Sequence, residues 1–251
     1  MKWPANCYHD SVSVLNPLAK EISAKIVYYG PGMSGKTTSL QVIHASLKPA
    51  HRGDLVSLET EGDRTLFFDF LPVHVEKVRG LDVRLQLYTV PGQVFYGATR
   101  QLVLDGADGV IFVADSQADA RDRNIESLND LEVNLRKQGT SLKELPHVIQ
   151  YNKRDLPDLL SVDVLRQDLN AYDAPDFETS ASSGLGVVEA LKEVVNLVKK
   201  ALGRRAEPPP RRADTARRQS FDAEAAMQRS RLPDSMAASI TGTWSSQGVA
   251  V

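Results

Sequence analysis

Hydrophobic and polar positions alternate along residues 1–202 with two different periods. Short runs that are apolar throughout, or at every second residue, are typical of strands, whereas apolar residues three or four positions apart are typical of helices. The strand pattern occurs at residues 24–30, 54–59, 65–73, 83–90, 109–116, 147–153 and 176–181, and the helical pattern occurs at residues 36–47, 122–138, 161–170 and 186–202. Strands that alternate with helices predict an α/β fold, with a mainly parallel sheet and helices on both faces. We expect the strands at 65–73 and 83–90 to pair antiparallel, because both alternate at every second residue.

This alternation stops after Leu202. Residues 203–251 are rich in Pro, Arg, Ser and Ala and contain eight Arg against five acidic residues. The segment therefore carries a net charge of +3, which leaves −5 of the chain's total of −2 for residues 1–202. So few apolar residues bury too little surface to offset the entropy of ordering the segment. We expect an N-terminal extension at residues 1–20, a folded domain at 21–202 and a disordered tail at 203–251.

The composition argues against several classes of protein. With a formal net charge of −2, the chain is not expected to bind nucleic acid. Cys7 is the only cysteine, so an internal disulfide is impossible and a reducing compartment fits. No stretch approaches the length of about 18 apolar residues typical of a membrane-spanning helix, and the first residues lack the apolar centre of a signal peptide. We expect a cytoplasmic protein without a transmembrane segment, monomeric as an isolated chain.

The stretch GPGMSGKTTS at residues 30–39 matches the pattern G-x-x-x-x-G-K-[ST], in which a glycine-rich loop follows a strand and opens a helix. Its glycines let backbone N–H groups turn toward phosphate oxygens, and the helix start adds partial positive charge. Lys36 would reach the β- and γ-phosphates, and the hydroxyl of Thr37 would bind Mg²⁺. The residues expected to contact the nucleotide here are Gly30, Pro31, Gly32, Met33, Ser34, Gly35, Lys36, Thr37 and Thr38.

A second motif follows a later apolar strand, where NKRD supplies Asn152, Lys153 and Asp155. Ligands of open α/β sheets bind at the carboxyl ends of the strands. An aspartate there accepts two hydrogen bonds from guanine, and adenine offers no such pair of donors. Asn and Asp also favour plain turns, so this assignment depends on the phosphate-binding loop upstream. The stretch ETSASSG places backbone N–H groups of Ser180 and Ala181 near the base carbonyl, unless it is simply a serine-rich loop before a helix.

The order of these motifs, with PGQ at residues 91–93 between them, resembles that of the Ras-like P-loop GTPases. Longer stretches, such as KIVYYGPGMSGKTTSLQ, TEGDRTLFFDFLP and HVIQYNKRDLP, are similar to the MglA family of bacterial small GTPases over residues 20–202. The resemblance implies a regulatory GTPase that binds GTP and GDP with Mg²⁺, hydrolyses GTP slowly and controls cell polarity or gliding motility in a bacterium. It also implies a roadblock-fold, MglB-like dimer that activates hydrolysis, an exchange factor, polarity or motility effectors, and enrichment at a cell pole in the GTP state.

The same resemblance implies which residues take part in hydrolysis. Gly92 would contact the γ-phosphate, and Gln93 would orient the attacking water. Arg64 would act as an arginine finger that the protein itself supplies. Thr65 would close on Mg²⁺ in the GTP state, although from the sequence alone Thr60 lies within the same reach. Thr37 and Thr65 are therefore the predicted metal ligands.

One position departs from the general Ras-like pattern. The strand at residues 83–90 carries Thr89 where Ras-like proteins usually have an aspartate beside Mg²⁺, and the MglA family shares this feature. Mg²⁺ keeps several waters and needs few protein ligands, so Thr37, phosphates and water would suffice with weaker binding. The strand at 65–73 is typical of a core strand, and the resemblance adds that part of it shifts register when GTP binds.

Two rival functions stay open. The threonine at position 89 motivates a GTP-dependent binding or scaffold module that does not hydrolyse its nucleotide. A P-loop kinase of a small molecule would need an acceptor site and usually a lid with arginines. The sequence shows no such insertion, and the NKRD motif at residues 152–155 favours guanine over adenine.

Overall fold

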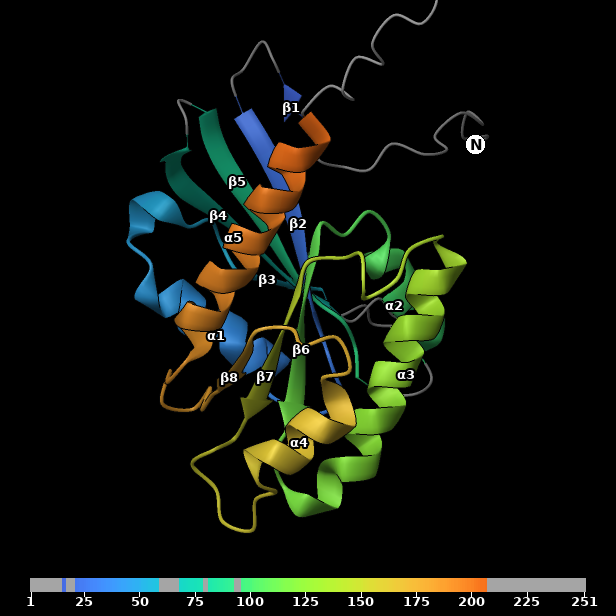
Figure 1. Cartoon of the computed structure of the whole chain (residues 1–251). Helices are drawn as coiled ribbons and strands as arrows, with labels where there is room; N and C mark the ends of the chain where they lie inside the picture. The colour runs from blue at the N-terminus through green and yellow to red at the C-terminus, as the bar shows by residue number, and fades with distance from the viewer. Residues whose placement is uncertain (1–14, 17–20, 59–67, 79–80, 93–95, 207–251) are drawn as a thin grey trace, which may run out of the picture. The chain divides into compact units, whose positions relative to one another are not determined.

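The computed structural model describes residues 15–16, 21–58, 68–78, 81–92 and 96–206 of the 251-residue chain (Figure 1). Within these residues eight strands form one sheet, in the order β3-β4-β5-β2-β6-β7-β8, with β1 paired to β2 beside this path. The strands are β1 (Leu15–Asn16), β2 (Glu21–Tyr29), β3 (Val56–Leu58), β4 (Phe68–Val78), β5 (Leu81–Thr89), β6 (Gly109–Asp115), β7 (His147–Asn152) and β8 (Asp176–Glu178). The helices are α1 (Lys36–Ser46), α2 (Gly97–Leu104), α3 (Arg121–Lys137), α4 (Val162–Leu169) and α5 (Val187–Ala206), with short 3₁₀ helices at Pro49–His51 and Ala118–Ala120.

The sheet is mainly parallel, as the sequence predicts. Strand β2 pairs in parallel with β5 and β6, and the parallel pairing continues through β7 to β8. Strands β3, β4 and β5 pair antiparallel, with Phe70 of β4 opposite Tyr88 of β5, which confirms the predicted antiparallel pair. Because the parallel strands share one direction, the loops that follow β2, β6, β7 and β8 meet at one edge of the sheet.

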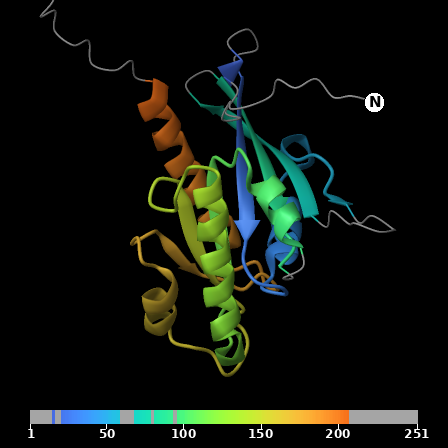
Figure 2. The same ribbon diagram turned by 90° about the vertical axis from the view of Figure 1, so that its right-hand side faces the viewer.

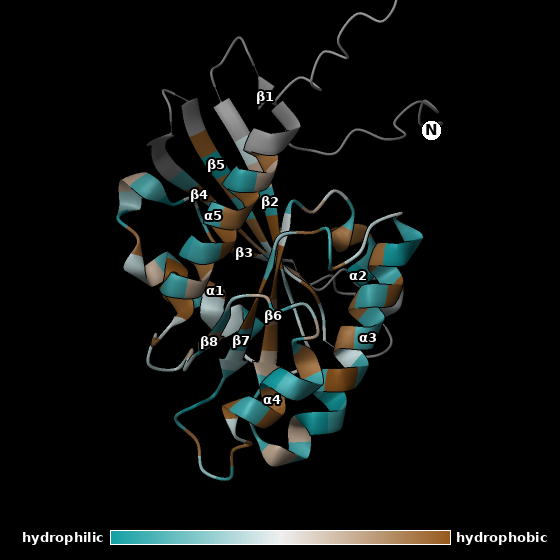
Figure 3. Ribbon diagram, viewed as in Figure 1, coloured by the Kyte–Doolittle hydropathy of each residue, from teal (hydrophilic) through white to brown (hydrophobic). Residues whose placement is uncertain are grey.

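Helices cover both faces of the sheet, because successive residues of a strand point to opposite sides. Ile26 and Tyr28 of β2 belong to a core built with α1 and α5. Val27 and Tyr29 belong to a second core built with α2, α3 and α4. Figure 2 shows α3 in front of the sheet, and in Figure 3 strand β6 is mostly brown while much of α3 is teal. The predicted helical layers on both faces are therefore confirmed.

Helix α2 is absent from the sequence-based prediction. It has eight residues and starts at Gly97, so its periodic signal is short and begins with a poor helix former. Its burial of Val103 and Leu104 against the second core, with Leu102 left 61% exposed, is what orders it as a helix.

Several boundaries also differ from the prediction. The predicted strand at 54–59 forms only over β3, and the one at 176–181 ends at Glu178, because the chain then turns into a loop that faces β7. Helix α5 continues to Ala206, past the predicted end of the domain at residue 202. Two residues of the predicted N-terminal extension form β1 and pair with Ile22 and Glu21. Residues 207–251 of the predicted tail lie outside the described residues.

Candidate functional site

The loop between β2 and α1 curls so tightly that two of its positions require glycine. Gly30 has a φ of 138° and Gly35 a φ of 100°, in the region that glycine occupies most readily. A Cβ on Gly30 would lie 2.2 Å from Val113 O of β6, and one on Gly35 would lie 2.2 Å from Asn152 Nδ2. The backbone of the loop therefore packs directly against the ends of the neighbouring strands. This close packing suits a loop whose N–H groups surround phosphates.

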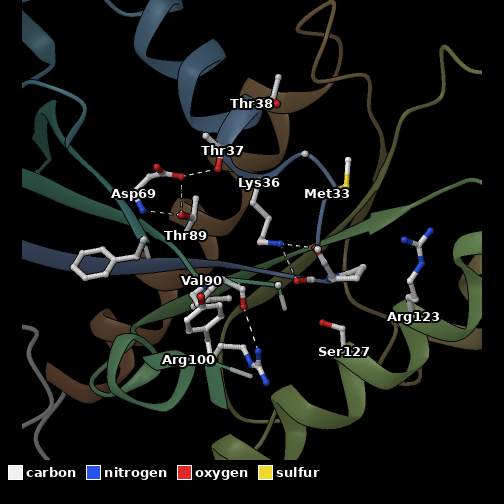
Figure 4. Close-up of a pocket in the computed structure, with 18 of the residues that line it drawn as sticks. Met33, Lys36, Thr37, Thr38, Asp69, Thr89, Val90, Arg100, Arg123 and Ser127 are labelled. Carbon is white, nitrogen blue, oxygen red and sulfur yellow. Dashed lines mark hydrogen bonds between the residues drawn. The ribbon is translucent and has the colours of Figure 1, made fainter. Parts of the chain in front are cut away.

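A cavity of about 1240 Å³ opens beside this loop (Figure 4). The predicted residues that line it are Gly30, Pro31, Gly32, Met33, Gly35, Lys36, Thr37, Thr38 and Gly92. Ser34, in the same loop, is instead fully buried, and its hydroxyl has no hydrogen-bond partner among the described residues. The cavity is also lined by residues that the sequence did not single out, among them Ser57, Asp69, Arg100 and Arg123.

Lys36 lies at the bottom of the loop and is only 7% exposed. Its Nζ donates to the carbonyl oxygens of Gly30, at 2.9 Å, and Pro31, at 2.6 Å. The pKa of Lys36 is lowered to about 7, chiefly by burial and further by the positive charge of Arg100, while the negative charge of Asp69 opposes both. A buried ammonium group with a depressed pKa is stabilised by any anion that enters beside it. This environment fits a phosphate.

A buried carboxylate occupies the other side of the loop. Thr37 Oγ1 donates to Asp69 Oδ2 at 2.6 Å, and Thr89 Oγ1 donates to the same oxygen at 2.9 Å. Ser57 Oγ donates to Asp69 Oδ1 at 2.7 Å. Figure 4 shows the side chains of Thr37 and Thr89 both directed at Asp69. Sequence reasoning missed Asp69, and the available signal was an acidic residue between two phenylalanines in a strand.

Arg100 of α2 links the PGQ loop to α3. The side chain is buried, its Nε donates to Asp130 Oδ2 of α3 at 2.8 Å, and its Nη1 donates to Pro91 O at 3.3 Å. The next residue, Gly92, approaches the phosphate loop so closely that a Cβ on it would lie 2.2 Å from Gly32 N. Sequence reasoning missed Arg100, because α2 was not predicted.

Asn152, at the end of β7, joins the phosphate loop to the loop after β8. Its Nδ2 donates to Ser34 O at 2.7 Å, while its Oδ1 accepts from Ala181 N at 2.9 Å and from Thr179 Oγ1 at 3.1 Å. The side chain is 1% exposed, and an amide, unlike a carboxylate, can donate to one loop and accept from the other. The N–H of Ala181 was predicted to reach the base carbonyl. In the structure this N–H donates to Asn152 Oδ1. To contact a base as well, it would have to bind both acceptors or change its partner.

Lys153 and Asp155 follow at the exposed side of the same strand end. Lys153 has a φ of 67°, and its Nζ lies 2.6 Å from Asp115 Oδ2 at the end of β6. Asp155 is exposed and accepts a hydrogen bond from Ser182 Oγ at 2.9 Å. Hydrogen bonds from Ser180 and Ser182 hold the pKa of Asp155 below its ordinary value. The carboxylate therefore stays ionised at neutral pH, as an acceptor of hydrogen bonds from a base must. These residues do not line the cavity beside the phosphate loop.

Four predicted residues lie outside the described part of the chain. They are Thr60, Arg64, Thr65 and Gln93. Their proposed roles in hydrolysis and metal binding, and the register shift expected at the start of β4, remain predictions from the sequence.

The oxygen donors beside the phosphate loop are of the kind that Mg²⁺ uses. Among the described residues, no group of three or more His, Cys, Asp or Glu side chains could hold a metal ion. A hydroxyl and a single carboxylate, such as Thr37 and Asp69, are hard oxygen donors of the kind that Mg²⁺ uses together with phosphates and water. In the same described part of the chain, no helix is long and apolar enough to span a membrane.

Comparison with known proteins gives two matches. The profile of the ADP-ribosylation factor (Arf) family matches residues 11–198. The chain is also 52% identical, over 187 residues, to the mutual gliding-motility protein MglA of Myxococcus xanthus (strain DK1622). That alignment covers 74% of this chain and 96% of the relative.

Proposed function

Because this chain belongs to the Arf family of Ras-like small GTPases, we propose that it is a molecular switch that binds GDP and GTP and hydrolyses GTP slowly. One observation carries this proposal. The phosphate-binding loop and the NKRD motif, more than a hundred residues apart, meet at one edge of the sheet, where Asn152 Nδ2 donates to Ser34 O at 2.7 Å. A phosphate site and a guanine site at this spacing form one nucleotide site.

At the phosphate end, the loop residues 30–35 would surround the β-phosphate with backbone N–H groups. Lys36 would exchange its present carbonyl partners for phosphate oxygens, and its pKa would rise with the anion beside it. The hydroxyl of Thr37 would hold Mg²⁺, which when bound neutralises phosphate charge. Gly92, whose backbone lies close to Gly32, would bring the PGQ loop to the γ-phosphate.

At the base end, the carboxylate of Asp155 would accept hydrogen bonds from two N–H groups of guanine. Lys153 would lie along the base while held by Asp115, and Asn152 would keep the loop of Ser180 and Ala181 beside the base. An adenine ring has no matching pair of donors, so this end selects guanine.

For hydrolysis, Gln93 would orient the attacking water and Arg64 would neutralise the charge that develops on the transferred phosphate. Thr65, or in its place Thr60, would close on the metal in the GTP state. An arginine in the transition state contributes about 10³–10⁵ in rate, so slow intrinsic turnover would follow if Arg64 is not yet in place.

The similarity to a gliding-motility protein points to the role of the switch in the cell. The proposed output is control of cell polarity or gliding motility in a bacterium through effectors that bind the GTP form. A roadblock-fold dimer of the MglB kind would activate hydrolysis, and an exchange factor would reload GTP. The isolated chain would be a monomer in the cytoplasm, enriched at a cell pole in the GTP state.

The test is single-turnover phosphate release from GTP-loaded protein with Mg²⁺, with and without a roadblock-type partner. Wild type should release phosphate slowly alone and much faster with the partner. Arg64→Ala should abolish the stimulation, and Gln93→Leu should stop release while leaving GTP bound. Arg84→Ala, which removes an exposed arginine of β5, is the matched control and should behave as wild type. If GTP binds but no condition releases phosphate, the chain is a GTP-dependent binding module instead.

A further inference from the structure

The threonine that ends β5 lies beside the phosphate loop but carries no charge. Thr89 is opposite Tyr28 in the parallel pairing of β5 with β2, and Val90 N, one residue on, donates to Tyr28 O at 3.1 Å. The phosphate loop begins two residues after Tyr28, with Gly30. A hydroxyl at this place can hydrogen-bond, but it cannot offer a negative charge to a cation.

A carboxylate lies instead on the neighbouring strand, β4, where it belongs to Asp69. Asp69 of β4 is 8% exposed, and its Oδ2 lies 2.6 Å from Thr37 Oγ1. Thr37 is the residue whose hydroxyl is expected at Mg²⁺. The carboxylate reaches it because β4 runs antiparallel beside β5, with Phe70 opposite Tyr88, which brings Asp69 next to Thr89.

Thr89 holds this carboxylate in place. Its hydroxyl donates to Asp69 Oδ2 at 2.9 Å and at the same time accepts from the backbone N–H of Asp69 at 2.8 Å. The backbone N–H and the carboxylate of Asp69 thus hydrogen-bond to the same hydroxyl, and Thr89 is only 3% exposed. Ser57 secures the second carboxylate oxygen at 2.7 Å. A valine or alanine at position 89 would remove both restraints.

The direction of the hydrogen bonds prepares Thr37 for a cation. A hydroxyl has one proton and two lone pairs, and the Thr37 proton is committed to Asp69. Its oxygen therefore presents lone pairs, not a proton, to the cavity. Burying a carboxylate is costly unless it is hydrogen-bonded or paired with a positive charge. A divalent cation beside Thr37 would supply that charge.

We propose that Asp69, on β4, supplies the carboxylate that orders the water shell of the nucleotide-bound Mg²⁺, and that Thr89 is a positioning residue for it. The inference rests on the proposed nucleotide function. The carboxylate then comes from Asp69 on β4, whereas Ras-like proteins usually carry it at the end of the strand that corresponds to β5. The threonine at position 89 therefore does not indicate a defective metal site. Because Asp69 belongs to β4, the distance of its carboxylate from the metal would depend on the position of that strand.

The experiment measures release of a fluorescent GDP analogue from the full-length protein at buffered free Mg²⁺. Wild type should release GDP slowly above a characteristic Mg²⁺ concentration and fast in EDTA. Asp69→Asn should raise the midpoint about 10- to 100-fold, as loss of a partner outside the metal's direct ligands typically does. Its rate in EDTA should match wild type, which a general loosening of the fold would not allow. Glu126→Gln removes the same charge from another wall of the cavity and should leave the midpoint unchanged.

A second pair of variants separates metal ordering from structure. Asp69→Asn combined with Thr89→Asp returns a carboxylate to the end of β5 and should bring the midpoint back toward wild type. Thr89→Val keeps Asp69 but frees it, so its midpoint should rise by less than that of Asp69→Asn. If Asp69→Asn does not retain GDP, Thr89→Val still decides, since an unchanged midpoint overturns the proposal.

The outcomes separate this inference from the proposed function. A wild-type chain that binds no GDP in Mg²⁺, although folded, overturns the nucleotide function and the inference with it. GDP binding in which Asp69→Asn and wild type share one midpoint overturns the role of Asp69 alone.

Discussion

The two ends of the candidate nucleotide site are built differently. At the base end, Asn152 uses both halves of its amide to join two loops, and Lys153 is paired with Asp115. At the phosphate end, Lys36 is buried with a pKa lowered to about 7, and Asp69 is a buried carboxylate held by hydroxyl groups. The buried polar groups of the base end find their partners within the protein itself. The phosphate end instead holds charges that an anion and a cation would complete.

This difference shows where a switch can reside. The base end consists of strand ends from β6 and β7 and the loop after β8, inside the parallel part of the sheet. The phosphate end is assembled from α1, from α2 and from the antiparallel strands at the edge of the sheet. A ligand can shift an element only if it interacts more favourably with one of that element's positions. Elements whose charges are completed by the ligand meet this condition. We therefore expect specificity to reside at the base end and state-dependent change at the phosphate end.

The largest expected effect tests the base end. Asp155→Asn replaces an acceptor pair with one acceptor and one donor, which no longer matches guanine but matches xanthine. We expect GDP affinity to fall by about 10³-fold or more, since a site built for hydrogen bonds rejects a mismatched partner strongly. Competition of GDP and XDP against labelled GDP measures the change. Asp158→Asn, on the same exposed loop, is the control and should bind GDP as wild type. Equal GDP affinity in Asp155→Asn would contradict the guanine assignment.

The second prediction concerns the residue that couples the two ends. Asn152→Ala leaves Ser34 O and Ala181 N without their partner in a buried place. The free energy of unfolding should fall by about 2–4 kcal/mol, because each unpaired buried group costs about 1–3 kcal/mol. Urea unfolding of the nucleotide-free protein measures it, because bound GDP would add its own stabilisation. Asn170→Ala removes a half-buried asparagine that joins Ala174 in a similar way, and should cost only about 1 kcal/mol. Similar losses of unfolding free energy in the two variants would mean that Asn152 stabilises the fold no more than an ordinary loop asparagine.

The third prediction concerns pH at the phosphate end. The pKa of Lys36 falls from 10.5 to about 7 on folding, so the nucleotide-free fold gains stability as pH rises between these values and carries the full penalty below 7. Phosphate restores the proton, so above pH 7 GDP binding should take up a proton and weaken by up to about tenfold per pH unit. Calorimetry at pH 8 in two buffers of different ionisation enthalpy measures the uptake. Lys36→Arg, which stays charged, should bind with no uptake, and an absence of uptake in wild type would refute the buried neutral lysine.

The smallest expected effect concerns the link from α2 to α3. Asp130→Asn weakens the ion pair with Arg100, whose side chain is 9% exposed while that of Asp130 is 36% exposed. We expect a loss of about 1 kcal/mol in unfolding free energy, at the low end for a hydrogen bond to a charged group because Asp130 is partly screened by water. Thermal unfolding measures the loss. Glu132→Gln, which removes the exposed pair with Arg136 on the same helix, should cost less than about 0.5 kcal/mol. Equal losses would show that Arg100 does not anchor α2.

Contiguous motifs were predictable from the sequence alone. The phosphate loop at 30–37, the NKRD motif at 152–155 and most strands are encoded in short runs, because a glycine-rich turn or a buried strand needs only its own residues to be recognisable. The mainly parallel α/β fold and the antiparallel pair of β4 and β5 followed from the same patterns. Helix α2 did not, since its eight residues take their order from the core beneath them. Gln93 and Arg64 stay predictions, because they lie outside the described residues.

The composition of the phosphate end was decided by tertiary structure. Asp69 is 32 residues from Thr37 and 20 residues from Thr89 along the chain, and only the pairing of β4 with β5 brings the three together. In the sequence, Asp69 is only a polar residue within an apolar strand, and Thr89 only marks a position where Ras-like proteins usually have an aspartate. Local patterns reveal which residue types a loop needs, whereas the position of a charge in space depends on strand register, which long-range packing determines.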